Sequence, residues 1–230
     1  MSYLGTTKIG KMFLGTTEIA KAYLGSDLVF QKGGGVTPPT PSVNYLVFGN
    51  PSIQGNILHP DLNSRNFIYT DEPFDPGTQE WIIQTKIKIN TAIANKVFIA
   101  SVDGDGVFQY SIFVMTDSGV GNTSFKLYLS SNGTSWNLLS GGCQGSMEAG
   151  TYRVFQIVCT RSGNNYIYKL GFPEIPAWTQ TVSKTSHPLF GKRISFGGGA
   201  NSYGLDADID LSETKIWIGG NLWWEAISSQ

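Results

Sequence analysis

The sequence predicts an all-β protein, an antiparallel β-sandwich preceded by a short N-terminal segment of β-repeats. The composition is the first observation: of 230 residues 28 are glycine, 13% are aromatic and only 14% are charged, against an average charged fraction of about 25%. Short runs that alternate apolar and polar residues recur along the chain, with turn-forming residues between them. No segment shows an apolar helical stripe with a cap. Many strands joined by turns explain all three observations.

The first 32 residues repeat with a period of ten. Tyr3–Met12, Phe13–Ala22 and Tyr23–Lys32 each begin with an aromatic residue and Leu-Gly, followed by two small polar residues, one variable residue and a β-branched apolar residue. A segment of this size is below the roughly 40 residues at which a domain usually folds alone. We therefore expect residues 1–32 to anchor the protein and to associate with other copies. The expected interface residues are Tyr3, Leu4, Ile9, Phe13, Leu14, Ile19, Tyr23, Leu24 and Val29. The alternative is a β-meander that packs on the main domain.

Residues 33–42 are predicted to be a linker. Gly33–Gly35 ends the repeat, and the prolines of Val36–Ser42 favour an extended, semi-rigid spacer. The predicted organisation is thus a repeat segment at 1–32, a linker at 33–42 and a sandwich domain at 43–230.

The strands of the sandwich follow from alternation. In Trp81–Ile89, the residues Trp81, Ile83, Thr85, Ile87 and Ile89 share one face, and Gln84, Lys86 and Lys88 share the other. Further strands are predicted at Val97–Val102, Val107–Met115, Phe125–Leu129, Ser135–Leu139, Thr151–Thr160, Tyr166–Leu170, Lys192–Phe196 and Glu213–Ile218. An Asn-Gly pair at 132–133 predicts a hairpin turn, and Arg161–Asn165 predicts another.

Several function classes are disfavoured by the composition. The net charge is −1, without the basic excess of a nucleic-acid-binding chain. No apolar stretch approaches 18 residues, and Met1–Thr7 lacks the pattern of a secretion signal, so we expect neither membrane insertion nor Sec secretion. Cys143 and Cys159 are too few for a disulfide framework, and the two histidines, each next to a proline, do not form a zinc motif.

Acidic residues offer two candidate sites. Asp206, Asp208 and Asp210 fall on one face of an extended strand, as paired catalytic carboxylates would, or as residues of a solvated strand. Asp103 and Asp105 sit in an Asp-Gly-Asp-Gly sequence, which suits Ca²⁺ but also suits a hairpin turn. Gly197–Asn201 lacks the Gly-Lys-Ser/Thr ending of a phosphate loop, and no Ser-His-Asp set is recognisable. We expect no enzyme activity, and Ca²⁺ is the only cofactor to consider.

Aromatic residues are the strongest indication of function. Trp217 is out of phase with Ile216 and Ile218, which predicts that its ring faces outward. Such rings stack on sugars, fill subunit interfaces or pack in the core. The candidates for a glycan or interface role are Trp136, Trp178, Tyr203, Trp217, Trp223 and Trp224.

These features resemble a known family. The strand succession from Trp81 to Ile218 resembles the concanavalin A-like jelly roll, particularly its laminin-G type. The tail from Ala207 to Trp224, with its Ile-Asp-Leu and Trp-Trp, is similar to the closing pattern of jelly rolls in bacteriophage fibres and appendages. The Leu-Gly-Thr/Ser repeats are similar to those that head structural proteins of phages infecting gut bacteria. The family's glycoside hydrolases carry Glu-x-Asp-x-x-Glu on one strand, and this sequence lacks that motif.

The resemblance implies a virion protein that is assembled in the host cytoplasm. It would be a head- or tail-attached fibre, a homo-oligomer taken to be a trimer, anchored to other virion proteins by its repeats. Its jelly roll would face outward, with host-surface glycans as candidate ligands. The alternatives are a stand-alone carbohydrate-binding lectin-type module and, ranked after it, a glycoside hydrolase. The module would bind sugar without the repeats, and the hydrolase would lose turnover on changing Asp208 or Asp210 to Asn.

Overall fold

A computed structural model describes most of the chain. It describes residues 2–4, 7–9, 13–14, 17–18, 21–24, 27–31, 42–60, 65–91, 96–104, 108–119, 122–130, 137–138, 150–176, 180–184, 190–199 and 206–228. The chain divides into two compact units, residues 1–42 with 229–230, and residues 43–228.

The repeat unit contains three antiparallel hairpins. They pair β1 (Ser2–Leu4) with β2 (Thr7–Ile9), β3 (Phe13–Leu14) with β4 (Thr17–Glu18), and β5 (Lys21–Leu24) with β6 (Asp27–Gln31). One hairpin therefore corresponds to each ten-residue repeat. The side chains of this segment lie outside the described part of the chain, so the interface roles expected for Tyr3, Leu4 and their counterparts stay predictions.

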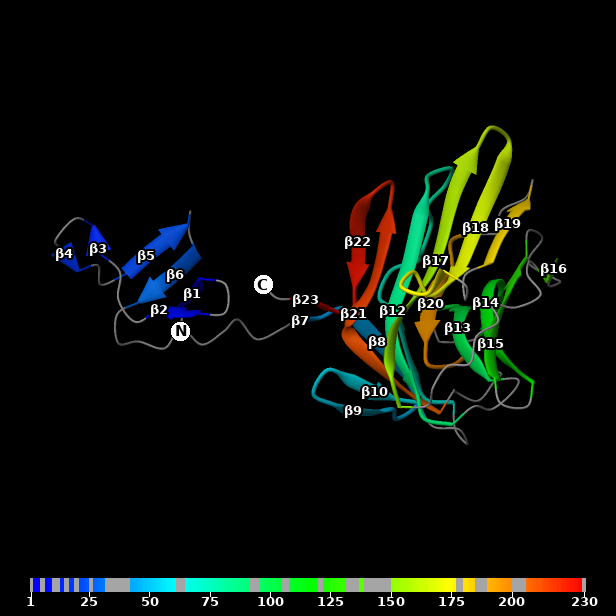
Figure 1. The fold of residues 1–230 in the computed structure, drawn as a ribbon, viewed down its shortest axis with the longest axis horizontal. Helices are drawn as coiled ribbons and strands as arrows, with labels where there is room; N and C mark the ends of the chain where they lie inside the picture. The colour runs from blue at the N-terminus through cyan, green and yellow to red at the C-terminus, as the bar shows by residue number, and fades with distance from the viewer. Residues whose placement is uncertain are drawn as a thin grey trace. The chain divides into compact units, whose positions relative to one another are not determined.

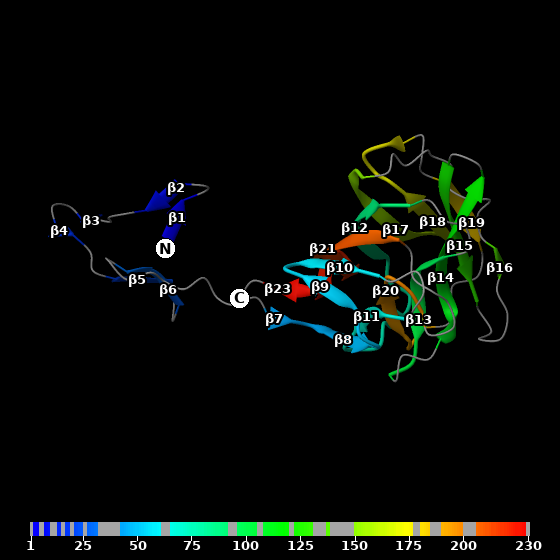
Figure 2. The same cartoon turned by 90° about the horizontal axis from the view of Figure 1, so that it is seen from below.

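The second unit is an antiparallel sandwich of two sheets (Figures 1 and 2). The eight-stranded sheet has the order β19-β18-β17-β12-β21-β10-β9, and β22 also pairs with β21. In chain order its strands are β9 (Ser52–Gln54), β10 (Ile57–His59), β12 (Trp81–Ile89), β17 (Tyr152–Ser162), β18 (Asn165–Gly171), β19 (Gln180–Lys184), β21 (Ala207–Ile218) and β22 (Asn221–Glu225).

The seven-stranded sheet has the order β16-β15-β14-β13-β20-β11-β8. Its strands are β8 (Tyr45–Phe48), β11 (Phe67–Thr70), β13 (Val97–Val102), β14 (Phe108–Gly119), β15 (Asn122–Leu129), β16 (Asn137–Leu138) and β20 (Arg193–Phe196). A short pair of strands, β7 (Ser42–Val43) and β23 (Ile227–Ser228), joins the two ends of the unit. Within the described ranges, no helix is long and apolar enough to span a membrane.

The core lies between the two sheets and is rich in aromatic side chains. The rings of Phe98, Phe125 and Phe155 lie 4.8 to 5.4 Å apart between centroids, and all three are fully buried. Trp81 meets Phe74 edge to face at 5.5 Å. Burying one such ring stabilises the fold by roughly 1.5–3 kcal/mol. The alternation in β12 is confirmed, because Trp81, Ile83, Thr85, Ile87 and Ile89 are all buried and the residues between them are not.

The strands that the sequence did not reveal are short or uniformly buried. β11 buries all four of its residues, so it has no alternation to detect. β7, β9, β10 and β23 have only two or three residues, and β8, β19 and β22 have four or five. The predicted turn at residues 132–133, and Cys143, lie outside the described residues. The predicted turn after β17 is present at Gly163, whose φ is 59°.

Candidate functional site

The outward face of the eight-stranded sheet is the candidate functional surface. On β12 the outward side chains Ile82, Gln84, Lys86 and Lys88 are partly exposed. On the corresponding face of the seven-stranded sheet, the side chains of β11 are buried. There Phe67 and Tyr69 belong to a cluster separate from the main core, yet they are 0% and 6% exposed. On the eight-stranded sheet, two cross-strand rows can be followed from the register.

The first row is apolar and contains Trp217. The register places Val158 opposite Ile82, Ile82 opposite Trp217, and Trp217 opposite Leu222, across β17, β12, β21 and β22. We call these four residues the apolar row. Leu222 is 48% exposed. Beside the row is a cavity of about 110 Å³, lined by Glu80, Trp81, Ile82, Val158, Cys159, Thr160, Trp217 and Gly220.

The second row is polar and uncharged at its centre. Gln156 lies opposite Gln84, and Gln84 lies opposite Lys215. The Gln156 Nε2 donates to Gln84 Oε1 at 2.7 Å. No bond within the described part of the chain uses the Gln84 amide nitrogen or the Gln156 amide oxygen. Next to the apolar row, the sheet therefore presents one amide donor and one amide acceptor.

A bulge in β21 separates these rows from the charged end of the sheet. Asp210 pairs with Lys86 and Lys215 pairs with Gln84, so residues 211–214 of β21 lie opposite Thr85 alone. On its other side, β21 pairs with β10 up to Asp210, which lies opposite Ile57. From Lys215 onward it pairs with β22. Bulges of this kind redirect strands and often occur beside functional sites.

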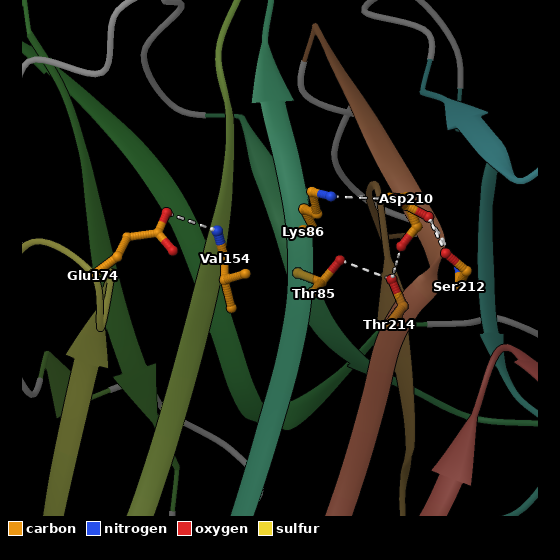
Figure 3. Close-up of polar contacts among 7 residues, drawn as sticks. All are labelled: Thr85, Lys86, Val154, Glu174, Asp210, Ser212 and Thr214. Carbon is orange, nitrogen blue, oxygen red and sulfur yellow. Dashed lines mark hydrogen bonds and ion pairs between the residues drawn. The ribbon is translucent and has the colours of Figure 1, made fainter. Parts of the chain in front are cut away.

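Hydroxyl groups hold the bulge together (Figure 3). Thr85 Oγ1 lies 2.8 Å from Thr214 Oγ1, and Thr214 Oγ1 donates to the Asp210 carbonyl oxygen at 2.9 Å. The Asp210 carboxylate accepts from the Ser212 backbone N–H at 3.1 Å and from its hydroxyl at 2.6 Å. Asp210 Oδ2 is also 3.8 Å from Lys86 Nζ. Figure 3 also shows Glu174 accepting from the Val154 N–H at 3.2 Å, on neighbouring β17.

Asp208 is the centre of the charged end. Its carboxylate accepts from His59 Nδ1 at 2.8 Å and from Asn90 Nδ2 at 3.1 Å, and it pairs with Lys88 Nζ. Asp208 is only 7% exposed, so it does not belong to a solvated strand, one of the two interpretations of the aspartates. Burial raises the pKa of Asp208, but the hydrogen bonds from Lys88, Asn90 and His59 outweigh it and leave the pKa below its ordinary value.

The other charges at this end are also paired. The hydrogen bond to Asp208 raises the pKa of Lys88. Lys86 and Lys88 lie 5.7 and 5.2 Å from the centroid of the Tyr152 ring, and burial raises the pKa of Tyr152. Asp208 is thus paired with Lys88, and Asp210 with Lys86. The lowered pKa of Asp208 is the opposite of the raised pKa that a carboxyl group acting as a general acid needs.

The remaining candidate residues are dispersed. Trp224 is 6% exposed and stacks on Phe196 at 5.7 Å, and Trp223 is partly buried against Phe74 at 5.6 Å. Asp103 pairs with Lys192 Nζ at 2.8 Å. The described residues include no group of three or more His, Cys, Asp or Glu that could hold a metal ion. Trp136, Trp178, Tyr203 and Asp105 lie outside the described part of the chain.

Sequence reasoning missed the polar row beside Trp217 and the partners of Asp208. Gln84, Gln156 and Lys215 were not singled out, and neither were Lys88, Asn90 and His59 around Asp208. The alternation of β12 did indicate that Gln84 and Lys88 face outward. Their neighbours come from strands far away in the sequence, so only the register of the sheet could have revealed them.

Comparison with known proteins defines the fold. No protein-family model and no curated protein matches the sequence. The carbohydrate recognition domain of Emp47p is similar, with a TM-score of 0.51 and 11% identity over 80% of this chain and 92% of that one. A variant of HCR/D has a TM-score of 0.50 and 12% identity over 79% of this chain and 44% of that one. The CBM2 module of evolved Dit from Lactobacillus casei phage J-1 has a TM-score of 0.46 and 11% identity, over 83% and 94%. The chain has the predicted fold, an antiparallel sandwich of the lectin-like jelly-roll type.

Proposed function

We propose that the sandwich unit binds glycans on the outward face of its eight-stranded sheet. One observation carries the proposal: Trp217 lies in a partly exposed apolar row, next to a row of amides. An indole covers the apolar C–H face of a sugar, while amide groups exchange hydrogen bonds with its hydroxyls. Binding sites in general combine apolar walls with a few oriented polar groups, and this face has both.

The fold likeness agrees with this proposal, since Emp47p contributes a carbohydrate recognition domain of similar architecture. The surface is shallow, because the cavity beside Trp217 measures only about 110 Å³, below the roughly 300 Å³ at which typical ligand pockets begin. A single site should therefore bind weakly. Several copies held together gain about 10² to 10⁴ in avidity without any new contact.

The proposal extends to the whole chain as an oligomeric appendage of a phage particle. The repeat unit, with one hairpin per ten residues, would anchor it to other virion proteins and hold several sandwich units outward. The support is the repeat itself and its resemblance to segments that head phage structural proteins. The function proposed is binding without catalysis, because the two paired aspartates of the sheet, Asp208 and Asp210, face lysines.

The glycan proposal is tested on an array of bacterial surface polysaccharides. We expect the full chain to bind a subset, and Trp217→Ala to abolish the signal. Ser183→Ala, an exposed change on β19, serves as the control and should retain it. Equal binding by the Trp217 variant would refute the assignment of the site. Release of reducing sugar from a bound polysaccharide, lost in Asp208→Asn, would favour the hydrolase instead.

The appendage proposal has a separate test. Peptide mass spectrometry of purified phage particles should find the chain in a fixed ratio to the major capsid protein. Deletion of residues 1–35 should lower the oligomeric state measured by light scattering. Each sandwich unit should still bind the sugar on its own. A protein absent from particles, or an unchanged oligomer after the deletion, would contradict the anchor role and leave a stand-alone lectin.

A further inference from the structure

One edge of the seven-stranded sheet exposes apolar side chains. Four large apolar residues of the described chain are exposed, and three of them lie within five positions: Val43 at 60%, Leu46 at 38% and Val47 at 47%. Leu46 and Val47 belong to β8, the outermost strand of this sheet (Figure 2), and Val43 lies in β7 just before it. We call these three residues the β8 edge patch.

β8 has a single neighbour in its sheet. Its four residues pair with β11 without a bulge, and within the described ranges no strand pairs with its other side. The core ends at β11, because Ile68 is 0% exposed whereas its register partner Val47 is 47% exposed. The outer side of β8 therefore presents backbone groups that the sheet does not pair, beside apolar side chains. This arrangement accepts another strand.

Other edges of the sandwich expose polar side chains. Ser52 and Gln54 are exposed on β9, at one edge of the eight-stranded sheet, and Thr181 and Ser183 are exposed on β19, at its opposite edge. Natural edge strands carry charges, prolines or bulges that prevent pairing with another chain. β8 has none of these, and no residue from 33 to 60 is Asp, Glu, Lys or Arg. Only its length of four residues limits what it can bind.

The charges at the two ends of β11, the neighbour of β8, favour one orientation of a partner. Arg65 precedes β11, and Asp71 and Glu72 follow it, and all three residues are exposed. Arg193 donates to the Asp71 carbonyl and balances one of these acids, which leaves a net negative charge at this end. Two copies joined through parallel β8 strands would place like charges at the same end. Antiparallel strands place the acidic end of one copy beside the basic end of the other, so complementary potentials favour them.

We propose that the β8 edge patch binds the same patch of a second copy of this chain, through antiparallel pairing of the two β8 strands. The patch itself is uncharged, so two copies meet there without repulsion between like charges. The chain also enters the sandwich unit at Ser42, directly before the patch. The linker of ten residues spans at most about 36 Å when fully extended. Copies joined through residues 1–32 therefore keep their patches within reach of one another.

The contact should be weak in separate sandwich units. Three side chains on each copy do not supply the roughly 1,200 Å² that a stable specific interface buries. A short tether raises the local concentration of a partner to about the millimolar range, so the contact should form when the copies are held together. In this respect alone the inference rests on the proposed function, in which the repeat unit joins the copies.

The symmetry of the pair predicts which residues meet. Identical antiparallel strands are related by a twofold axis perpendicular to the sheet, which keeps each side chain on its own face. One residue on the axis then lies opposite its own counterpart, and the exposed candidates in β8 are Leu46 and Val47. Directly opposite residues of antiparallel strands have Cα atoms about 4.5–5.5 Å apart. This separation lies within the range of about 4.4–6.8 Å that a disulfide spans.

The test is disulfide formation in the full chain with Leu46→Cys and Val47→Cys, each oxidised at about 10 µM and at about 1 mM, the latter matching a tethered concentration. The controls are Ser183→Cys, exposed on β19, and the unmodified chain, which contains Cys143 and Cys159. We expect one of the two β8 variants to form a covalent dimer at least about tenfold faster than Ser183→Cys. A lysine at the other β8 position, Leu46→Lys or Val47→Lys, should remove this excess, because charged edges oppose pairing.

Light scattering on the same samples separates this inference from the proposed oligomer. In an oligomeric chain we expect excess cross-linking at both concentrations, and its absence would overturn the β8 contact while the oligomer stood. A monomeric chain would refute the tether, and excess cross-linking at the higher concentration alone would still support the contact. No excess over Ser183→Cys at either concentration overturns the contact in both cases and would leave the patch to a strand of another protein. Circular dichroism establishes that each variant retains the fold.

Discussion

The two buried threonines that hold the β21 bulge should contribute unequally to stability. Thr85 and Thr214 are both 0% exposed. Because Thr214 Oγ1 donates its proton to the Asp210 carbonyl, the hydroxyl hydrogen between the two threonines must come from Thr85. Thr85→Val removes this donor and leaves only a lone pair on Thr214 unused. Thr214→Val removes the acceptor of the Thr85 hydroxyl. It also removes the hydroxyl that donates to the Asp210 carbonyl oxygen.

The magnitudes follow from these losses. Deleting one buried hydrogen bond without leaving a donor unsatisfied costs about 1 kcal/mol. Each buried polar group that is left without a partner costs about 1–3 kcal/mol. We therefore expect Thr85→Val to lower the free energy of unfolding by about 1 kcal/mol. Thr214→Val leaves two buried groups without a partner and should lower it by about 2–6 kcal/mol. The double variant should lose less stability than the sum of the two single variants. In Thr214→Val the hydroxyl of Thr85 already lacks its acceptor, so replacing Thr85 as well removes that unsatisfied group.

Urea denaturation of the full chain measures all three variants, and valine has the shape of threonine, so no cavity confounds the result. A loss of 1 kcal/mol should lower the Tm by about 2–4 °C in a unit of this size. Equal losses for the two single variants would refute the assigned direction of the hydrogen bonds. Additive losses would show that the two hydroxyls are not coupled.

Three further predictions concern single groups. Because the pKa of Asp208 is lowered in the folded state, its stabilisation is complete above the unfolded pKa of about 3.9 and is lost as the pH falls through the folded pKa. Urea titrations at pH 6 and about pH 3 should therefore show a smaller acid-induced loss in Asp208→Asn than in wild type, and equal losses would contradict this. Burial raises the pKa of Cys159 to about 12, so iodoacetamide at pH 8 should label Cys159 only after unfolding, as peptide mapping would show, and native labelling would contradict its burial. Gly197 has a φ of 90°, and a Cβ there would lie 2.9 Å from Pro60 Cγ, so Gly197→Ala should cost about 1–3 kcal/mol. Gly55→Ala, at positive φ with open space around it, should cost only about 1 kcal/mol, and an equal cost for both would show that the contact with Pro60 is relieved without strain.

The sequence predicted the parts of the fold in which local pattern and burial agree. β12 and β13 begin and end at the predicted residues, since β12 alternates and β13 is apolar except for Ser101. β11 is fully buried over only four residues, and such a run is too short for its pattern to distinguish strand from loop. β21 begins six residues before its predicted start at Glu213, because the bulge between Asp210 and Lys215 interrupts the alternation.

The candidate site could be predicted only in part. The outward phase of Trp217 followed from its own strand, and the structure shows it opposite Ile82. The Gln84–Gln156 bond joins residues 72 positions apart, and the His59–Asp208 contact joins residues 149 apart. Such pairs depend on which strands become neighbours in the sheet. The alternation of single strands does not contain that information.

The most direct test of the glycan proposal is an NMR titration of the ¹⁵N-labelled full chain with the tightest array ligand. We expect the largest shift changes at the Trp217 indole N–H and at the side-chain amides of Gln84 and Gln156, in fast exchange and saturable. Shift changes confined to other parts of the sandwich, with these three side chains unmoved, would contradict the account.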